Sequence, residues 1–315
     1  MTNPASVASS LSPTVPAEGD PTATQERVRV PYPVRVLLVV VAMLVNIIVT
    51  PMVLGIPLQL AFNASGKTWP EWILVATGLI MRATPTLGAI GLVWLLMKYI
   101  DHRPVREAGL VVSRRSLPLA LVGIACSLVA IVPAGLALTN AGLLRPETGY
   151  VDGGSPLGTF LTVVVLGLLT QGFPEELLWR GYALQTMRHR PRTALVVSGV
   201  VFGAMHFISQ AGQQNVAEHF VYASSAMAFG LLAGALAIVT RSLWPAVGVH
   251  FGVHLAYYVA SLFDIGTGPW LWASEALLFG LMAAIVVLVF RRSFSTPIDL
   301  GSAGQPGRAA PPASR

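Results

Sequence analysis

The sequence predicts an all-α, polytopic membrane protein with about eight transmembrane helices and both termini in the cytoplasm. The 315 residues are 54% hydrophobic and only 11% charged, with a mean hydropathy of +0.68, whereas soluble domains carry about 25% charged residues. Apolar runs long enough to cross a bilayer as a helix recur along the chain. These runs are continuous and lack period-two alternation, which argues against a transmembrane β-barrel.

The apolar runs predict eight spans in order, at about 36–62, 72–97, 117–138, 157–187, 193–209, 218–240, 244–263 and 270–290. Pro51 and Pro57 fall inside the first span. Because proline interrupts the helical hydrogen-bond ladder, we expect a kink or an early end there.

Basic residues gather in alternate loops, before the first span and after the second, fourth, sixth and eighth spans. The intervening loops hold only Lys67 and Arg145. Since basic residues mark the cytoplasmic side, both termini are predicted to be cytoplasmic. The net charge of +6 is therefore interpreted as a topology signal, and no nucleic-acid partner is expected.

The ends of the chain differ in composition from the transmembrane domain predicted at 34–292. Residues 1–33 are rich in Ser, Thr, Pro and Ala, and residues 293–315 are polar and rich in Pro, Gly and Ala. Such segments cannot bury enough apolar surface to offset the entropy of ordering. Both are predicted to be disordered cytoplasmic tails.

Ionisable residues inside the apolar spans are the strongest indication of a site. The fourth span contains FPEELLWRGYALQTM, the fifth VFGAMHF and the seventh VGVHFGVHLAYYV, which carry Glu175, Glu176, Arg180, His206, His250 and His254. A charged side chain at the bilayer centre costs roughly 2.5–3.5 kcal/mol on insertion scales, so such residues indicate function by default.

Depth along the helices brings these residues to one layer. Glu175, His206 and His254 each lie 13 residues from the arginine-bearing end of their span, which is about 20 Å at 1.5 Å per residue. His250 is one turn nearer the cytoplasm. Four groups from three helices are therefore expected to converge in a cavity, which we expect to open toward the cytoplasm.

Helical spacing separates the roles of the two adjacent acids. Glu176 and Arg180 are four residues apart and can form an ion pair, whereas Glu175 points about 100° away from Glu176 and stays available for chemistry. Gln171 shares the face of Glu175. Arg82, midway along the second span, is expected to be a structural partner for an acid or for helix-end carbonyls, with Glu176 as a candidate.

The residue types favour activation of a water molecule. A carboxylate in a low-dielectric pocket becomes a competent general base, and imidazoles can polarise a carbonyl or stabilise an oxyanion. A zinc site is the alternative, because His250 and His254 have the i, i+4 spacing of paired zinc ligands. Glu175 and His206 would complete that set. Glu275, early in the last span, is given no role.

The motifs resemble those of the CAAX protease and bacteriocin-processing (CPBP or Abi) family of intramembrane endopeptidases. Glu-Glu-x-x-x-Arg matches Glu175, Glu176 and Arg180, and Phe-x-x-x-His matches Phe202 and His206. The last motif, His-x-x-x-Asn or Asp, matches His250 but has His254 where Asn or Asp is expected. The resemblance implies an eight-helix core in which Glu175 activates water with His206, while His250 and His254 stabilise the oxyanion.

The expected function is therefore CAAX-protease-like hydrolysis of a peptide bond without a cofactor. The alternatives are a zinc-dependent version using Glu175, His206, His250 and His254, and a non-catalytic membrane scaffold or bacteriocin-immunity protein. The expected partners are membrane lipid and a peptide or protein substrate, which is prenylated in eukaryotic relatives. The richness in Ala, Arg, Gly and Val is compatible with a high-GC bacterium, and the expected location is the bacterial inner membrane.

Overall fold

The structure, a computed structural model, describes residues 30–146 and 156–300. These residues form helices joined by short loops, and their only β-type contact is an isolated bridge between Arg145 and Thr267. The predicted all-α class is confirmed. Almost all of the predicted N-terminal tail, residues 1–29, lies outside the described residues.

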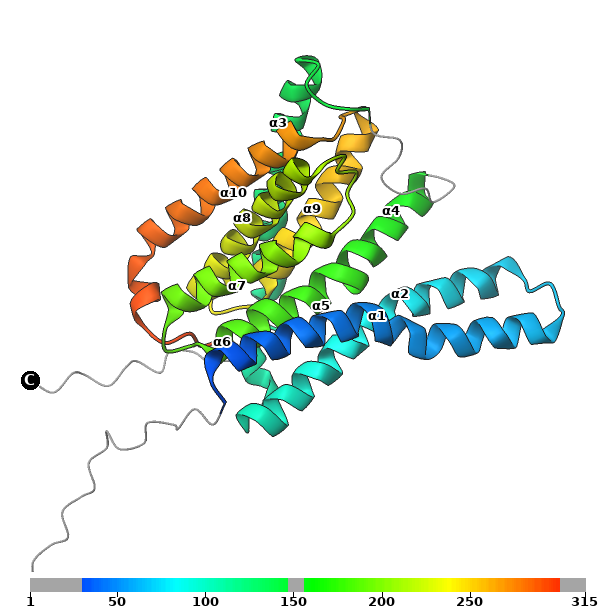
Figure 1. Cartoon of the computed structure of the whole chain (residues 1–315), viewed down its shortest axis with the longest axis horizontal. Coiled ribbons are helices and arrows are strands. Elements are labelled where there is room, and N and C mark those ends of the chain that lie inside the picture. The colour runs from blue at the N-terminus through cyan, green and yellow to red at the C-terminus, as the bar shows by residue number, and fades with distance from the viewer. Residues whose placement is uncertain (1–29, 147–155, 301–315) are drawn as a thin grey trace, which may run out of the picture.

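Two long helices open the chain as a hairpin that projects beyond the rest of the bundle (Figure 1). They are α1 (Tyr32–Ser65) and α2 (Glu71–Leu95), and α2 continues into a π-helical segment, η1 (Leu96–Asp101). The helix α1 runs through Pro51 and Pro57 to Ser65, so the early end considered for the first span is not found.

The fourth predicted span is one continuous helix that changes pitch. It comprises α4 (Pro156–Val164), the π-helical η3 (Val165–Gly172), α5 (Phe173–Glu176), the π-helical η4 (Leu177–Ala183) and α6 (Leu184–Thr186). We call it the central helix. Pro174, which has no N–H to donate, lies between the two π-helical segments. Such segments occur frequently at functional sites, and here they flank both glutamates.

The remaining long helices are α3 (Ser116–Asn140), α7 (Pro191–Met205), α8 (Val216–Thr240), α9 (Trp244–Leu262) and α10 (Pro269–Val289). Of these, α7, α8 and α9 contact the central helix, whereas α3 packs on α9 and α10 packs on α8. The helices α3 and α9 lie in especially close contact. Their backbones approach so closely that a Cβ on Gly248 would lie 2.0 Å from the carbonyl oxygen of Ala120. Small residues let membrane helices approach closely, and here they fix the position of the helix that carries two histidines.

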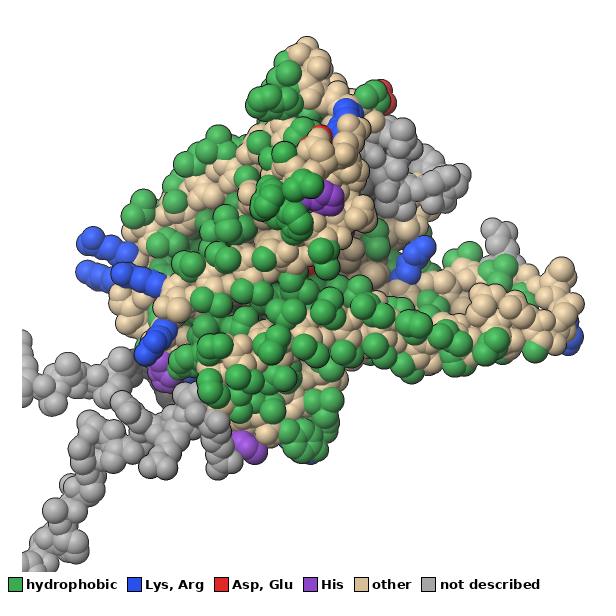
Figure 2. All heavy atoms as spheres, in the orientation of Figure 1, with side chains coloured by type: hydrophobic (Ala, Val, Ile, Leu, Met, Phe, Trp, Pro, Cys, Tyr) green, Lys and Arg blue, Asp and Glu red, His purple; other side chains and the backbone are tan. Residues whose placement is uncertain are grey.

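Seven helical stretches of the described chain are long and apolar enough to cross a membrane. They include every predicted span except the seventh, at 244–263, which forms α9 in the structure. Figure 2 shows apolar side chains distributed over the outer faces of the helices; Leu37 on α1, Leu60 on α1 and Leu288 on α10 are among the exposed ones. Exposed apolar faces of this length suit lipid contact. The chain is thus an integral membrane protein.

The end of the bundle that carries the arginine-bearing loops is tied together by ion pairs and by the chain after α10. Arg35 pairs with Asp101, and Arg103 pairs with Glu107. A short 3-10 helix, η6 (Arg291–Ser295), follows α10, and the side chains of Phe294, Ile298 and Leu300 are buried. Residues 293–300 therefore pack on the bundle, unlike the tail predicted from 293; residues 301–315 lie outside the described residues.

Candidate active site

Glu175 lies inside the bundle and faces a cavity. Its side chain is only 7% exposed, and its Oε2 atom is buried without a hydrogen-bond partner within the described residues. The cavity has a volume of about 600 Å³, in the range of sites that enclose small ligands. Gln171, one turn before Glu175, also lines it, as their shared helical face predicts.

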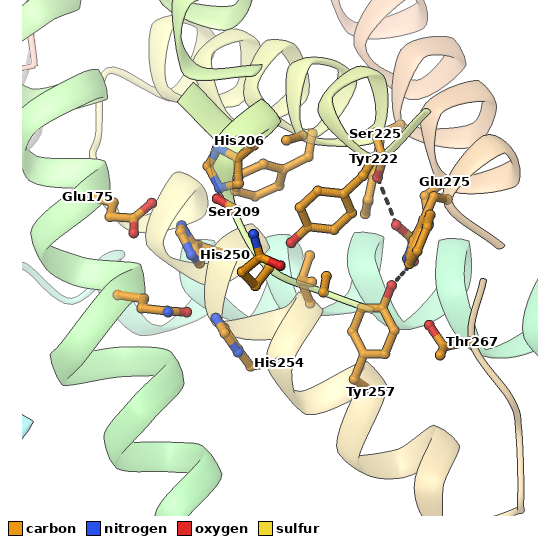
Figure 3. Close-up of a pocket in the computed structure, with 18 of the residues that line it drawn as sticks. Glu175, His206, Ser209, Tyr222, Ser225, His250, His254, Tyr257, Thr267 and Glu275 are labelled. Atoms are coloured by element: carbon orange, nitrogen blue, oxygen red, sulfur yellow. Dashed lines mark hydrogen bonds between the residues drawn. The ribbon is translucent and has the colours of Figure 1, made fainter. Parts of the chain in front are cut away.

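All four predicted site residues line this cavity: Glu175, His206, His250 and His254. Figure 3 shows the carboxylate of Glu175, on the central helix, pointing toward the imidazoles of His206 and His250 on the opposite wall. The rings of His250 and His254 are stacked, with centroids 5.6 Å apart and planes 9° from parallel. The predicted convergence of three helices on one layer is therefore present in the structure.

Glu176 points away from the cavity and joins two buried groups. Arg180 Nη1 donates to Glu176 Oε1 at 2.9 Å, and His250 Nδ1 lies 3.0 Å from the same oxygen. The side chains of Glu176 and Arg180 are fully buried. The predicted Glu176–Arg180 pair is confirmed. Arg82 is not its partner as suggested, because Arg82 is exposed.

Phe202 positions its neighbours through both its backbone and its ring. Its carbonyl oxygen lies 2.8 Å from His206 Nδ1. A carbonyl only accepts, so Nδ1 carries the proton and Nε2 of a neutral His206 keeps its lone pair. The Phe202 ring lies 4.4 Å from the His206 ring and 4.5 Å from the Arg180 guanidinium. The motif phenylalanine thus packs between the histidine and the ion pair.

Two glycines make room for site residues. A Cβ on Gly167, in η3, would lie 2.7 Å from His254 Cβ, and a Cβ on Gly230, in α8, would lie 2.7 Å from Arg180 Nη2. Both distances are shorter than a side chain tolerates without movement. The positions of His254 and Arg180 therefore depend on helix packing at glycine.

The same four residues are the candidate ligands of the zinc alternative. The contacts at Nδ1 of His206 and His250 resemble those that orient metal-ligating histidines. However, nowhere in residues 30–146 and 156–300 do three or more His, Cys, Asp or Glu side chains lie close enough together to hold one metal ion. The set Glu175, His206, His250 and His254 is therefore not arranged to hold a zinc ion in this structure.

Glu275, which was given no role, is a third glutamate of the site region. Its side chain is buried at 3% exposure and lines the same cavity. Ser225 Oγ and Tyr257 OH each donate to it at 2.7 Å (Figure 3). The signal that could have found it is the one that identified Glu175, an acid within an apolar span. Glu275 belongs to none of the recognised motifs. The sequence alone does not show that α8, α9 and α10 meet around this residue.

The cavity lies toward the end of the bundle opposite to the arginine-bearing loops. Its wall includes Ser209, Gln210 and Ala211 after α7 and Thr267 before α10, whereas the arginines precede α7 and follow α10. Toward the arginine-bearing end the central helix is closed, because every residue from 174 to 187 is buried. The expectation that the cavity opens on the same side as the arginines is therefore wrong.

The segment that builds this site matches a known family. Residues 157–256 match the family described as type II CAAX prenyl endopeptidase Rce1-like. No curated protein matches the chain. The matched segment contains every predicted site residue from Gln171 to His254, and the family is one of endopeptidases. The segment that carries the site is thus similar to a family of CAAX-type endopeptidases.

Proposed function

We propose that the protein is an intramembrane endopeptidase in which Glu175 activates the water molecule that attacks the peptide bond. The observation that carries the proposal is the placement of Glu175: a buried carboxylate whose Oε2 has no partner among the described residues, on the wall of a cavity that it shares with three histidines. A carboxylate in such a low-dielectric site is a competent general base.

In the proposed reaction, Glu175 accepts a proton from water as the water oxygen bonds to the carbonyl carbon. The carbonyl π electrons move to oxygen and form a tetrahedral oxyanion. Collapse re-forms the carbonyl and breaks the C–N bond, while the proton held by Glu175 passes to the leaving amine. The Nε2 lone pair of His206 is suited to orient the water, because Nδ1 is held by Phe202.

His250 and His254 are proposed to stabilise the oxyanion. Glu176 constrains how His250 does so, since the Nδ1–H of His250 faces a carboxylate oxygen at 3.0 Å. The other nitrogen, Nε2, donates a hydrogen bond to an oxyanion only when His250 is protonated. Glu176 and Arg180 are thus proposed as positioning residues rather than as groups that touch the substrate.

The test is cleavage of a peptide reporter by the purified full-length chain and by Glu175→Gln, His206→Ala and His250→Ala. We expect Glu175→Gln to lower kcat by at least about a hundredfold, because general base catalysis contributes roughly 10²–10⁴-fold. The melting temperature of each variant controls for folding. Undiminished cleavage by a folded Glu175→Gln protein would contradict the proposal, whereas no cleavage by the folded wild-type chain would favour the non-catalytic scaffold.

A further inference from the structure

Glu275 is a second carboxylate in the cavity, and the proposed reaction does not use it. Its two oxygens accept hydrogen bonds from Tyr257 OH and Ser225 Oγ, both at 2.7 Å. Both donors are neutral hydroxyls, and no ion pair to Glu275 occurs within residues 30–146 and 156–300. A carboxylate is thus held in place, 3% exposed, without a cation to balance it.

Apart from its histidines, the cavity is lined by acidic rather than basic ionisable side chains. The described residues that line it include two glutamates, Glu175 and Glu275, and no lysine or arginine. The nearby arginines are already paired: Arg180 with Glu176, and Arg145 with Glu218 at 2.7 Å. Because a carboxyl group in a cavity with low-dielectric walls interacts strongly with an opposite charge, this composition favours a cationic ligand over an anionic one.

Aromatic rings surround the second carboxylate. Figure 3 shows Tyr222 between the histidines and Glu275, with Tyr257 below it, and the Tyr222 ring packs 5.4 Å from that of Trp272. Faces of aromatic rings attract cations. A carboxylate with adjacent tyrosine rings is therefore a suitable binding site for the ammonium group of lysine or the guanidinium group of arginine.

We propose that Glu275 is a specificity residue that binds a lysine or arginine side chain of the peptide substrate. This proposal rests on the proposed function, since it assigns the other end of the cavity to the scissile bond at Glu175. Because both carboxylates are fixed on rigid helices, the basic residue would lie at a constant distance in sequence from the bond that is cut. The substrate class is thus a polypeptide with a basic residue near the cleavage position.

The experiment is a cleavage profile of a mixed peptide library by the full-length protein in lipid nanodiscs. We expect wild-type products to show lysine or arginine enriched at one fixed position relative to the cut. Glu275→Gln keeps the size and hydrogen-bonding capacity of the side chain but removes its charge. It should reduce the preference for a basic residue by about tenfold or more, while cleavage of peptides that are neutral at that position persists.

Two control variants separate specificity from folding. Glu275→Asp retains the charge and should retain the basic preference. Glu107→Gln removes a carboxylate at the arginine-bearing end of the bundle, outside the cavity lining, and should leave the profile unchanged. A wild-type profile without a basic preference, or one unaltered in folded Glu275→Gln, would overturn the inference while leaving the role of Glu175 intact. Failure of the proposed function shows separately, as unchanged cleavage by Glu175→Gln.

Discussion

His250 Nδ1 and Arg180 Nη1 converge on one oxygen of Glu176, at 3.0 and 2.9 Å. The Glu176–His250 contact links the central helix to α9, so the ion pair within one helix also orients an imidazole of the other. The two adjacent glutamates thus differ in environment: Glu176 is enclosed between an arginine and a histidine, whereas Glu175 faces the cavity. One acid stabilises the site and the other is available for chemistry.

Removal of Glu176 should be strongly destabilising. Glu176→Ala leaves the fully buried guanidinium of Arg180 without its carboxylate, and breaking a buried pair in this way costs about 3–5 kcal/mol. The matched control is Glu107→Ala, which breaks another i, i+4 pair, with Arg103, and a longer contact of 3.6 Å with Arg188. The side chains of Arg103, Glu107 and Arg188 are 13%, 30% and 25% exposed. That change should cost about 1 kcal/mol or less. Denaturant unfolding in detergent measures both, and equal losses would contradict the structural role of Glu176.

Gly167→Ala should impair catalysis by displacing His254. The added methyl group would lie 2.7 Å from His254 Cβ and 3.0 Å from its Cγ, so the imidazole must move. A misplacement of about 1 Å in a catalytic group can cost a hundredfold in rate. The control is Gly78→Ala in α2, where a Cβ meets no atom within 4 Å. The measurement is the steady-state kcat of the two variants. Equal rates would show that the packing of Gly167 on His254 does not contribute to catalysis.

Accessibility to a thiol reagent should distinguish the two ends of the bundle. The chain has a single cysteine, Cys126, so Cys126→Ala provides a cysteine-free background. In that background, Ser209→Cys and Thr267→Cys place thiols at the cavity wall, and Arg192→Cys places one at the arginine-bearing end. If basic loops are cytoplasmic, a membrane-impermeant maleimide should label the first two in intact cells and the third only in inverted vesicles.

Labelling of all three positions from one side would contradict the opposite placement of the cavity and the arginines. Labelling with the sides reversed would leave the arrangement intact but reverse the orientation that the charges predict. Blocking with the same reagent before cell lysis controls for leakage. The outcome also identifies the side of the membrane from which a substrate reaches Glu175.

Removal of metal ions by a chelator tests whether the peptidase works without zinc. Because the four candidate ligands do not form a metal-binding group in this structure, we expect full activity after incubation with a strong zinc chelator. Elemental analysis of the purified protein is expected to show no zinc in stoichiometric amount. Loss of activity on chelation, restored by added zinc, would favour the metallopeptidase and would require Glu175 and the histidines to move closer together.

Much of the site could be predicted because the information is local to each helix. Apolar runs give the spans, the rise per residue gives depth, and the angle per residue gives faces. These rules placed Glu175, His206 and His254 in one layer and paired Glu176 with Arg180. They could not place Glu275, because its partners Ser225 and Tyr257 lie on two other helices and the contact depends on how α8, α9 and α10 pack.

The amino-acid sequence by itself therefore determined the membrane class, the order of the helices and the layer at which Glu175 meets three histidines. Tertiary packing alone decided which helices are neighbours, that Glu176 holds His250, that Glu275 shares the cavity, and that the cavity lies away from the arginines. The physical reason is that hydrophobic runs and helical geometry fix position along each helix. Close packing at residues such as Gly248 and Gly167 fixes lateral position, and that arrangement is not encoded within any single span.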